Sequence, residues 1–361
     1  MKILFLSHSV EGDAIKVGSH HLSREMARLG HDVAHVSTAI SLPQLLVRRD
    51  ATTRSRLSAA RNTSKRDEFG RLNTSYIVPI PMQKHSQHYF FQRRLKQLGF
   101  VNADLVFIDQ PLMNFVDCFH RAVVVYRPTD IHPDGAMRAR ERSIATACDG
   151  IVATSPGVLE SLASFRADVP TMVLENGVDF AAFASSPSDS AVPRSGYVYV
   201  GAVDSRFDWQ AIIVLAGAAP TERIDVFGPE RVERPLLPSN VTVHGPIPYA
   251  DLPRRLATYR VGLMPFNEHL LNEGRSPMKY YEYLSAGLFV LGKSTPELER
   301  RKSAGSFLYH HPSDIPDAVA NLQGLQSPNE DGREIAESMN WRNRAITLLD
   351  FAARIKTDNE C

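Results

Sequence analysis

Residues 261–291 read VGLMPFNEHLLNEGRSPMKYYEYLSAGLFVL, and this stretch decides the fold. Its two ends, Val261–Met264 and Leu288–Leu291, are short apolar runs of the kind that forms buried strands. Between them, Ser276 suits a helix N-cap and Gly287 suits the position after the last turn. A strand, a helix and another strand in this order predict a parallel sheet covered by helices.

The same alternation of apolar runs and amphipathic segments occurs in both halves of the chain. The predicted strands of the first half are Lys2–Ser7, Val33–Ser37, Tyr76–Ile80, Asp104–Ile108, Ala122–Tyr126, Gly150–Thr154 and Thr171–Leu174. Those of the second half are Tyr197–Val200, Arg223–Phe227, Val241–Val243, Val261–Met264, Leu288–Leu291 and Phe307–Tyr309. A polar stretch rich in Ser and Pro, AFASSPSDSAVPR, separates the two series and predicts a linker.

We therefore predict an α/β protein with two Rossmann-like, doubly wound domains that face each other across a cleft (residues 1–182 and 195–340). Residues 183–194 are the predicted linker. The amphipathic segment at 341–361 is expected to cross back and pack on the N-terminal domain. Ligands of such sheets bind beyond the carboxyl ends of the strands, so each domain offers one site.

Composition narrows the class of protein. A chain of 361 residues suits two domains, and a net charge of +1 gives no general attraction to nucleic acid. Cys118, Cys148 and Cys361 have no C-x-x-C spacing, which fits a reduced, cytoplasmic protein without a zinc site. The opening MKILFLSHS indicates a buried strand and not a signal peptide, and no run reaches the ~20 apolar residues of a membrane span.

Lys279 and Glu282 carry the chemistry of the decisive stretch. They are three residues apart and share a helix face, close to an N-terminus where Pro277 suits the first position. Free N–H groups, the helix dipole and the Lys279 charge together suit a diphosphate. Glu282, one turn deeper, can accept hydrogen bonds from ribose hydroxyls. The alternative for an isolated helix is a surface Lys–Glu pair.

The stretch resembles the donor-site segment of bacterial GT-B glycosyltransferases, in which a strand ending in Pro-Phe leads to S-P-x-K-x-x-E-Y-L-A-x-G. Five further stretches resemble this family and extend the likeness over most of the chain: GSHHLSREMARLGHDV (18–33), ENGVDFAAF (175–183), VYVGAVDSRFD (198–208), DVFGPE (225–230) and HGPIPYADLP (244–253). The resemblance implies an acceptor-binding N-terminal domain, a nucleotide-sugar-binding C-terminal domain and a nucleotide-sugar donor, with UDP as the expected nucleotide.

The resemblance also implies a set of donor-binding residues, namely Ser276, Met278, Lys279, Glu282, Gly201, Arg206, Gly228 and Ile247. Lys279 is the first choice for stabilising the leaving diphosphate and Arg206 the second, although Arg206 can equally be a solvent-facing side chain. GT-B enzymes use positive side chains and helix dipoles here, and the chain has no D-x-D motif. We therefore expect neither a metal nor another cofactor.

The sequence gives conflicting indications on whether the transfer inverts or retains the anomeric configuration. Many retaining members carry two glutamates eight positions apart, and here the first position is Gly274, with Glu273 one residue off. VVVYRPTDIHPDG (123–135) is similar to a segment of the β-glucuronosyltransferase of xanthan-type exopolysaccharide assembly, whose aspartate is the proposed base of an inverting reaction. The matching residue is Asp130, and its alternative is an N-cap or turn residue. That enzyme shares the Met278–Lys279 pair but has glutamine where Glu282 stands.

Acceptor recognition is expected in the N-terminal domain. His8 ends the first strand, and His20 and His21 begin the first helix, where the acceptor cleft should lie. Helix capping is the alternative for at least one of this pair. Basic residues recur from Arg48 to Arg71, and QKHSQHYFFQRRLKQLGF (83–100) mixes them with aromatics. This pattern suits an anionic membrane surface, with a solvated loop and a packed helix as the alternative. No nucleic-acid motif accompanies it.

The sequence thus predicts a metal-independent glycosyltransferase, hexosyl- or glucuronosyl-type, that acts on a polysaccharide precursor or lipid-linked acceptor. Its expected place is the cytoplasm, peripherally at the inner face of the plasma membrane. The main prediction is inversion with Asp130 as base. The alternatives are a retaining GT-B transferase, a nucleotide-sugar 2-epimerase and a binding protein without catalysis. A dehydrogenase is disfavoured, because no G-x-G-x-x-G follows a strand.

Overall fold

The structure is a computed structural model that describes residues 1–11, 16–47, 51–79, 84–165, 168–184, 193–274, 276–303 and 305–360. The chain divides into two compact units. Unit 1 comprises Met1–Glu175 and Trp341–Cys361, and unit 2 comprises Asn176–Asn340. The predicted linker at 183–194 lies largely outside the described residues, at 185–192, and its role as a domain boundary stays a prediction.

Unit 1 is built on a seven-stranded sheet with the order β4-β2-β1-β6-β7-β8-β9, in which all neighbouring strands are parallel. Its strands are β1 (Lys2–Ser7), β2 (Asp32–Ser37), β4 (Leu72–Thr74), β6 (Leu105–Ile108), β7 (Val123–Tyr126), β8 (Gly150–Ala153) and β9 (Thr171–Val173). A separate parallel pair is formed by β3 (Ile40–Ser41) and β5 (Ile77–Val78). The order of the large sheet reverses between β1 and β6, and this is its topological switch point.

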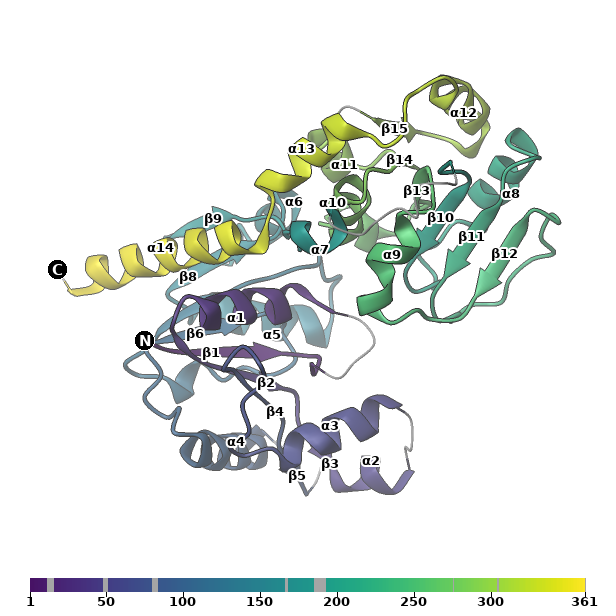
Figure 1. The fold of residues 1–361 in the computed structure, drawn as a ribbon. Helices are drawn as coiled ribbons and strands as arrows, with labels where there is room; N and C mark the ends of the chain where they lie inside the picture. The colour runs from purple at the N-terminus through teal and green to yellow at the C-terminus, as the bar shows by residue number, and fades with distance from the viewer. Residues whose placement is uncertain are drawn as a thin grey trace. The chain divides into compact units, whose positions relative to one another are not determined.

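The helices of unit 1 are α1 (Gly18–Arg28), α2 (Leu42–Val47), α3 (Ala51–Arg61), α4 (Lys84–Leu98), η1 (Val116–Cys118), α5 (Ala136–Ala145), α6 (Pro156–Ser161) and α14 (Trp341–Glu360). α14 belongs to unit 1 although it comes last in the chain, as its yellow colour in Figure 1 shows. It packs against α1 and β7. Gly150 makes room for it, since a Cβ there would lie 2.4 Å from Cδ1 of Ile355.

Unit 2 is built on a six-stranded sheet with the order β12-β11-β10-β13-β14-β15, again with parallel pairs. Its strands are β10 (Tyr197–Val200), β11 (Ile224–Phe227), β12 (Val241–His244), β13 (Val261–Met264), β14 (Phe289–Lys293) and β15 (Ser306–Tyr309). The order reverses between β10 and β13, so the switch point of this sheet lies at the carboxyl ends of those two strands.

The helices of unit 2 are α7 (Phe180–Ala184), α8 (Trp209–Ala218), η2 (Tyr249–Asp251), α9 (Leu252–Leu256), η3 (Leu270–Asn272), α10 (Met278–Ser285), α11 (Pro296–Arg300), η4 (Pro312–Asp314), α12 (Ile315–Leu322) and α13 (Glu330–Ser338). One apolar core lies on the α8 and α12 side of the sheet, and another lies around α9 and α10. The sheet is therefore covered on both faces, as a doubly wound fold requires.

The predicted fold class is confirmed: both units are doubly wound parallel sheets, and α14 returns to the N-terminal unit. The short strands β3 and β4 were not predicted, because two or three residues give too little alternation to detect. No helix in the part of the chain that the structure describes is both long and apolar enough to cross a membrane.

Candidate active site

Two glycines lie at the carboxyl ends of neighbouring strands in the sheet of unit 2. Gly201 follows β10 and Gly228 follows β11, and Gly201 N donates a hydrogen bond to Phe227 O at 2.8 Å. The two backbones touch: a Cβ on Gly228, whose φ is +146°, would lie 1.8 Å from the carbonyl oxygen of Gly201. Only glycine fits at residue 228, and the pair leaves bare backbone where a ligand can approach closely.

Lys279 lies directly over Gly201. A Cβ on Gly201 would lie 2.6 Å from Lys279 Cε and 2.9 Å from Nζ. The Nζ atom is also 5.9 Å from the centre of the Tyr199 ring. Lys279 is the second residue of α10, within the first turn, where the amide N–H groups of a helix have no intrahelical acceptors. A full positive charge, a helix N-terminus and a glycine edge therefore meet at one place, as the sequence predicts.

Tyr283 fixes α10 against the sheet. Its ring packs on Gly262 of β13, where a Cβ would lie 2.3 Å from two ring carbons. Its hydroxyl accepts a hydrogen bond of 3.1 Å from Val200 N at the end of β10. The tyrosine thus spans the switch point and sets the distance between α10 and Gly201. Sequence reasoning missed Tyr283, although the glycine within strand Val261–Met264 is a signal of close packing.

Glu282 lies one turn below Lys279 and is buried, with 5% of its surface exposed. Its Oε1 accepts a hydrogen bond of 3.1 Å from the Tyr249 hydroxyl. Burial raises the pKa of Glu282, while the Lys279 charge and the Tyr249 hydrogen bond act in the opposite direction. A carboxyl group has two oxygens that can each accept more than one hydrogen bond, so Glu282 can accept others besides that from Tyr249.

The entry to α10 differs from the prediction. The N-cap is Pro277, not Ser276, and Met278 is the first helical residue and is half-buried. The reason is that Ser276 is engaged elsewhere: its Oγ accepts hydrogen bonds of 3.2 Å from Asn176 N and from Arg301 Nη2. Asn176 Nδ2 also donates to Ser276 O at 2.8 Å. Ser276 therefore ties the N-terminus of α10 to the start of unit 2.

Arg206 lies in the loop after Gly201 and is paired within that loop. Its guanidinium makes two hydrogen bonds to Asp204, from Nε at 3.0 Å and from Nη2 at 2.6 Å. Asn272, which is buried, donates from Nδ2 to the carbonyl oxygen of Arg206 at 3.1 Å. The loop is thereby joined to the 267–274 segment. Because Asp204 already neutralises Arg206, Lys279 is the better placed cation for a diphosphate.

Ile247 lines a pocket of about 570 Å³ beyond β11 and β12. On its floor the His244 ring stacks on Phe227, with centroids 4.4 Å apart and an interplanar angle of 11°. Arg254 and Arg255 of α9 contribute to its wall. Its stacked rings, with Ile247 beside them, can contact a planar ligand such as a nucleobase.

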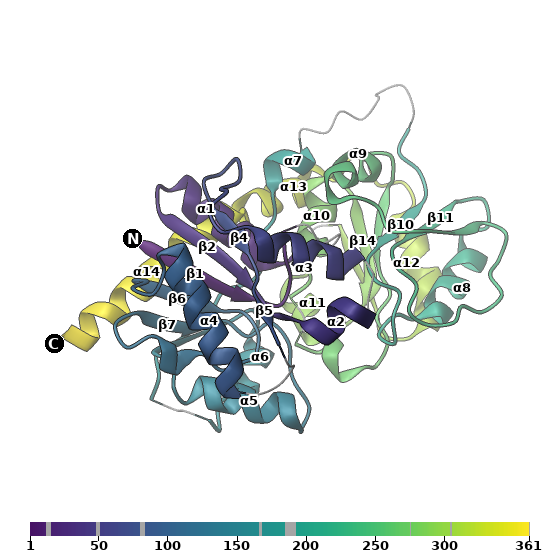
Figure 2. The same cartoon turned by 90° about the horizontal axis from the view of Figure 1, so that it is seen from below.

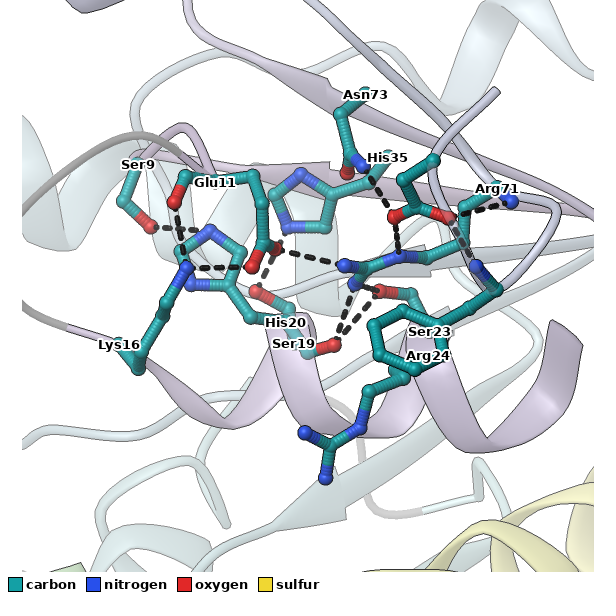
Figure 3. A network of polar contacts seen from close by, with 12 residues as sticks. Ser9, Glu11, Lys16, Ser19, His20, Ser23, Arg24, His35, Arg71 and Asn73 are labelled. Carbon is teal, nitrogen blue, oxygen red and sulfur yellow. Dashed lines mark hydrogen bonds and ion pairs between the residues drawn. The ribbon is translucent and has the colours of Figure 1, made fainter. Parts of the chain in front are cut away.

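In unit 1, His20 belongs to a buried polar network around Arg71, which Figure 3 shows. Arg71 Nη1 donates to the His20 carbonyl oxygen at 2.6 Å, and Nη2 donates to Glu11 at 2.9 Å. His20 Nδ1 accepts from Val17 N at 3.2 Å, which caps the helix, and Nε2 lies 3.3 Å from Ser9 Oγ. Burial lowers the pKa of His20 to about 4, so the ring is neutral at neutral pH.

His21 and His8 lie in different surroundings. His21 is 3% exposed, and its ring stacks on Trp341 of α14 with centroids 4.9 Å apart. This places it in the packing between α1 and α14. His8 follows β1 and is exposed, and its carbonyl oxygen accepts from Arg56 Nη2 at 2.9 Å. Of the three predicted histidines, His8 is thus the one with a solvent-exposed side chain.

Asp130 follows β7 by four residues and is half-buried, and its Oδ2 accepts from Thr129 Oγ1 at 2.8 Å. It is not an N-cap, because α5 begins at Ala136 after Gly135. Its role as base stays a prediction. Sequence reasoning passed over an ion pair nearby: Arg127 and Asp109, which follow β7 and β6, are 1% and 4% exposed, with Nη1 3.6 Å from Oδ1.

Comparisons with known proteins agree with the fold. Residues 210–357, which include α10, match a family model described as glycosyl transferase-like. The chain is similar to sucrose-phosphate synthase from Thermosynechococcus elongatus, with a TM-score of 0.74, 14% identity and coverage of 99% of this chain and 100% of that one. The chain has the GT-B fold. The Anabaena HepE structure in complex with UDP and glucose is also similar, with a TM-score of 0.69, 14% identity and coverage of 98% and 100%.

In sequence, the chain is similar to a Bacillus subtilis (strain 168) protein described as a teichuronic acid biosynthesis glycosyltransferase. The two are 26% identical over 227 residues, which is 57% of either protein. The match therefore spans little more than half the length of that curated relative. Together, these findings make the chain a GT-B protein with distant sequence similarity to glycosyltransferases, in agreement with the resemblance drawn from its motifs.

Proposed function

We propose that the chain is a glycosyltransferase that transfers a sugar from a UDP-sugar to a polysaccharide precursor or lipid-linked acceptor, without a metal. The observation that carries this is the Lys279 ammonium lying over Gly201 at the switch point of unit 2. The glycosyl transferase-like match over residues 210–357 and the UDP in the HepE structure support it.

In this proposal the N-terminus of α10 and Lys279 stabilise the negative charge that develops on the leaving diphosphate. The bare backbone at Gly201 and Gly228 lets the phosphates come close to the sheet edge. Glu282 accepts hydrogen bonds from ribose hydroxyls, and the pocket lined by Ile247 receives the base. Tyr283 holds α10 in place for these contacts.

For the stereochemistry we propose retention of the anomeric configuration, because Glu282 stands at the position of the second of the two glutamates that many retaining GT-B members carry. Retention replaces the main prediction from the sequence, which is inversion with Asp130 as the base. Gly274 stands where many retaining members have the first glutamate. Glu273, the residue before it, is exposed and offers a carboxylate one position away. The anomeric configuration of the product, read by nuclear magnetic resonance, separates the two.

Nucleotide binding is the first test. A thermal-shift panel of nucleoside diphosphates and UDP-sugars is measured on the wild type, on Lys279→Ala and on Lys302→Ala, which removes an exposed lysine of the same unit. At a hundred times its dissociation constant a ligand adds about 2.7 kcal/mol of stability. We expect UDP to stabilise the wild type and Lys302→Ala but not Lys279→Ala. No response from the wild type to any nucleotide would overturn the proposal.

Catalysis is tested with the nucleotide sugar that binds best. Release of UDP that depends on an added carbohydrate or lipid-linked acceptor supports transfer. Interconversion of the nucleotide sugar without any acceptor would instead identify a 2-epimerase. Binding without either reaction across an acceptor panel would favour a nucleotide-sugar-binding protein. Asp130→Asn then tests the N-terminal unit. If the wild type gives an inverted product and Asp130→Asn loses nearly all turnover, Asp130 is the base.

A further inference from the structure

Helix α2 of unit 1 is apolar and yet nearly uncovered. Its sequence is LPQLLV, and no residue of this helix is buried. Leu42, Leu46 and Val47 are 49%, 81% and 83% exposed. Leu42 and Leu46 are four residues apart and share a helix face. Single exposed apolar residues are ordinary on a protein surface, but three on one six-residue helix form a concentrated patch.

The helices α3 and α4 contain basic residues and no acidic ones. The segment 51–66, which includes α3, has five basic and no acidic residues, and α4 has four basic and no acidic residues. Figures 1 and 2 both place α2, α3 and α4 along the same side of unit 1. The apolar helix therefore lies on the same side of unit 1 as two helices whose charged residues are all basic, whereas Asp67 and Glu68 follow directly after residue 66.

The structure also sorts the basic stretch into internal and external members, which the sequence could not do. Arg71 is buried in the His20 network, and Arg94 is 5% exposed and donates from Nε to Ser75 O at 2.8 Å. Phe91 is fully buried in the core. These residues are structural, and their expected contribution to a surface is corrected accordingly. Arg48 and Arg49 lie outside the described residues.

Arg66 is exposed but pairs with Asp32 at 2.7 Å. The other exposed basic side chains on this side are Arg54, Arg61, Lys65, Arg93 and Lys96. Tyr89 of α4, 62% exposed, adds an aromatic ring with a polar tip. Apolar side chains that enter the acyl boundary, with cations at the level of the headgroups, are the composition of an interfacial membrane-binding surface. A nucleic acid would satisfy the cations but not Leu42, Leu46 and Val47.

We propose that the face formed by α2, α3 and α4 docks unit 1 on an anionic lipid surface, with Leu42, Leu46 and Val47 inserted and the exposed basic residues on the headgroups. The proposal goes beyond sugar transfer and does not depend on it. Each basic residue close to such a surface raises partitioning roughly fivefold, and salt screens this contribution. Insertion of α2 contributes independently of salt.

The test is co-sedimentation of the full chain with vesicles of phosphatidylcholine alone or mixed with phosphatidylglycerol. One variant, Leu46→Ser with Val47→Ser, removes the apolar patch. Another, Arg54→Gln, Arg61→Gln and Arg93→Gln, removes charge. Matched controls change exposed residues elsewhere, namely Leu236→Ser for the first variant and Arg231→Gln, Arg234→Gln and Arg342→Gln for the second. All substituted residues are exposed, so each variant should fold.

We expect the wild type and both controls to bind the anionic vesicles at low salt, and both patch variants to bind at least tenfold more weakly. Failure of the wild type to bind anionic vesicles at low salt would overturn the proposal. So would binding that needs the arginines but is indifferent to Leu46 and Val47, because that behaviour is adsorption to any polyanion. The UDP thermal shift, measured on the same samples, stays unchanged and separates a failure of docking from a failure of the donor site.

Discussion

Gly201→Ala should weaken nucleotide binding through Lys279 while leaving most of the fold intact. The new Cβ would lie 2.6 Å from Lys279 Cε and 2.9 Å from Nζ, where carbon contacts need about 3.5–4.0 Å. The lysine end is flexible and can retreat by about 1 Å. The same methyl group would meet the Tyr199 hydroxyl at 2.7 Å, and this more rigid contact is the reason to expect some loss of stability.

The size of the effect follows from the interaction that is lost. A hydrogen bond to a charged group contributes about 1.5–3 kcal/mol, so UDP should bind roughly 10- to 150-fold more weakly. The free energy of unfolding should fall by about 1 kcal/mol, or roughly 2–4 °C for a unit of this size. Titration calorimetry with UDP and a thermal melt without ligand measure the two quantities separately.

A double-mutant cycle with Lys279→Ala tests the reasoning itself. If Gly201→Ala acts by displacing the ammonium, then adding it to Lys279→Ala changes UDP affinity no further. An equal loss in both backgrounds would show that the methyl group blocks the phosphates directly. Unchanged UDP affinity in Gly201→Ala alone would refute the placement of Lys279 at the diphosphate.

Gly228→Ala is the contrasting variant, because its Cβ meets backbone. The atom in the way is the Gly201 carbonyl oxygen, at 1.8 Å, and the φ of +146° adds strain for any residue with a Cβ. Overpacking and strain together should cost about 3 kcal/mol or more of folding stability. If Gly228→Ala instead melts like the wild type, the close approach of the two loops is not present in solution.

Three further predictions concern buried ionisable groups. Glu282→Gln should weaken UDP binding yet raise stability at neutral pH. Burial raises the pKa of Glu282 above 4.5, so its carboxyl group makes the folded state less stable as pH rises through that pKa. Urea titrations across pH should therefore show a steeper loss of stability with rising pH in the wild type than in Glu282→Gln. Asp109→Asn and Arg127→Met should each cost about 3–5 kcal/mol of folding stability, because each removes one charge of a buried ion pair. The double variant should cost less than the sum of the two, and additive losses in chemical denaturation would contradict the ion pair. His20 has its pKa lowered from 6.5 to about 4, so it contributes roughly 3 kcal/mol that is present above pH 6.5 and lost as pH falls to about 4. His20→Gln should reduce that acid-side slope without abolishing it, because burial also lowers the pKa of His21 and His35. The exposed His120→Gln should leave the slope unchanged, and identical slopes in wild type and His20→Gln would contradict a buried, neutral ring.

Much of the fold was predictable because its signals are local. Every predicted strand of unit 2 matches an observed strand to within two residues, since each is an apolar run bounded by glycine or polar residues. The Lys279–Glu282 pair was equally accessible, because helical spacing fixes which side chains share a face. The predictions fail where residues distant in the sequence bind a side chain that was expected to act locally. Ser276 does not cap α10 because Asn176 and Arg301 engage its hydroxyl, and a single sequence does not show those partners.

The candidate acceptor region shows the same limit more sharply. A sequence does not show how deeply a single histidine is buried, so it predicts the same cleft position for His20 and His21. Tertiary packing separates them: His20 joins the network of Arg71, which lies 51 residues away, and His21 stacks on Trp341 of the last helix. The same distance hid the role of Arg71, which looked like one more cation of a basic stretch. Whether the basic stretch can form a binding surface depends on which of its side chains point into the protein. Arg71 and Arg94 do so and therefore do not contribute to the surface. The exposed cations that remain are those that we propose act together with the exposed leucines and valine of α2.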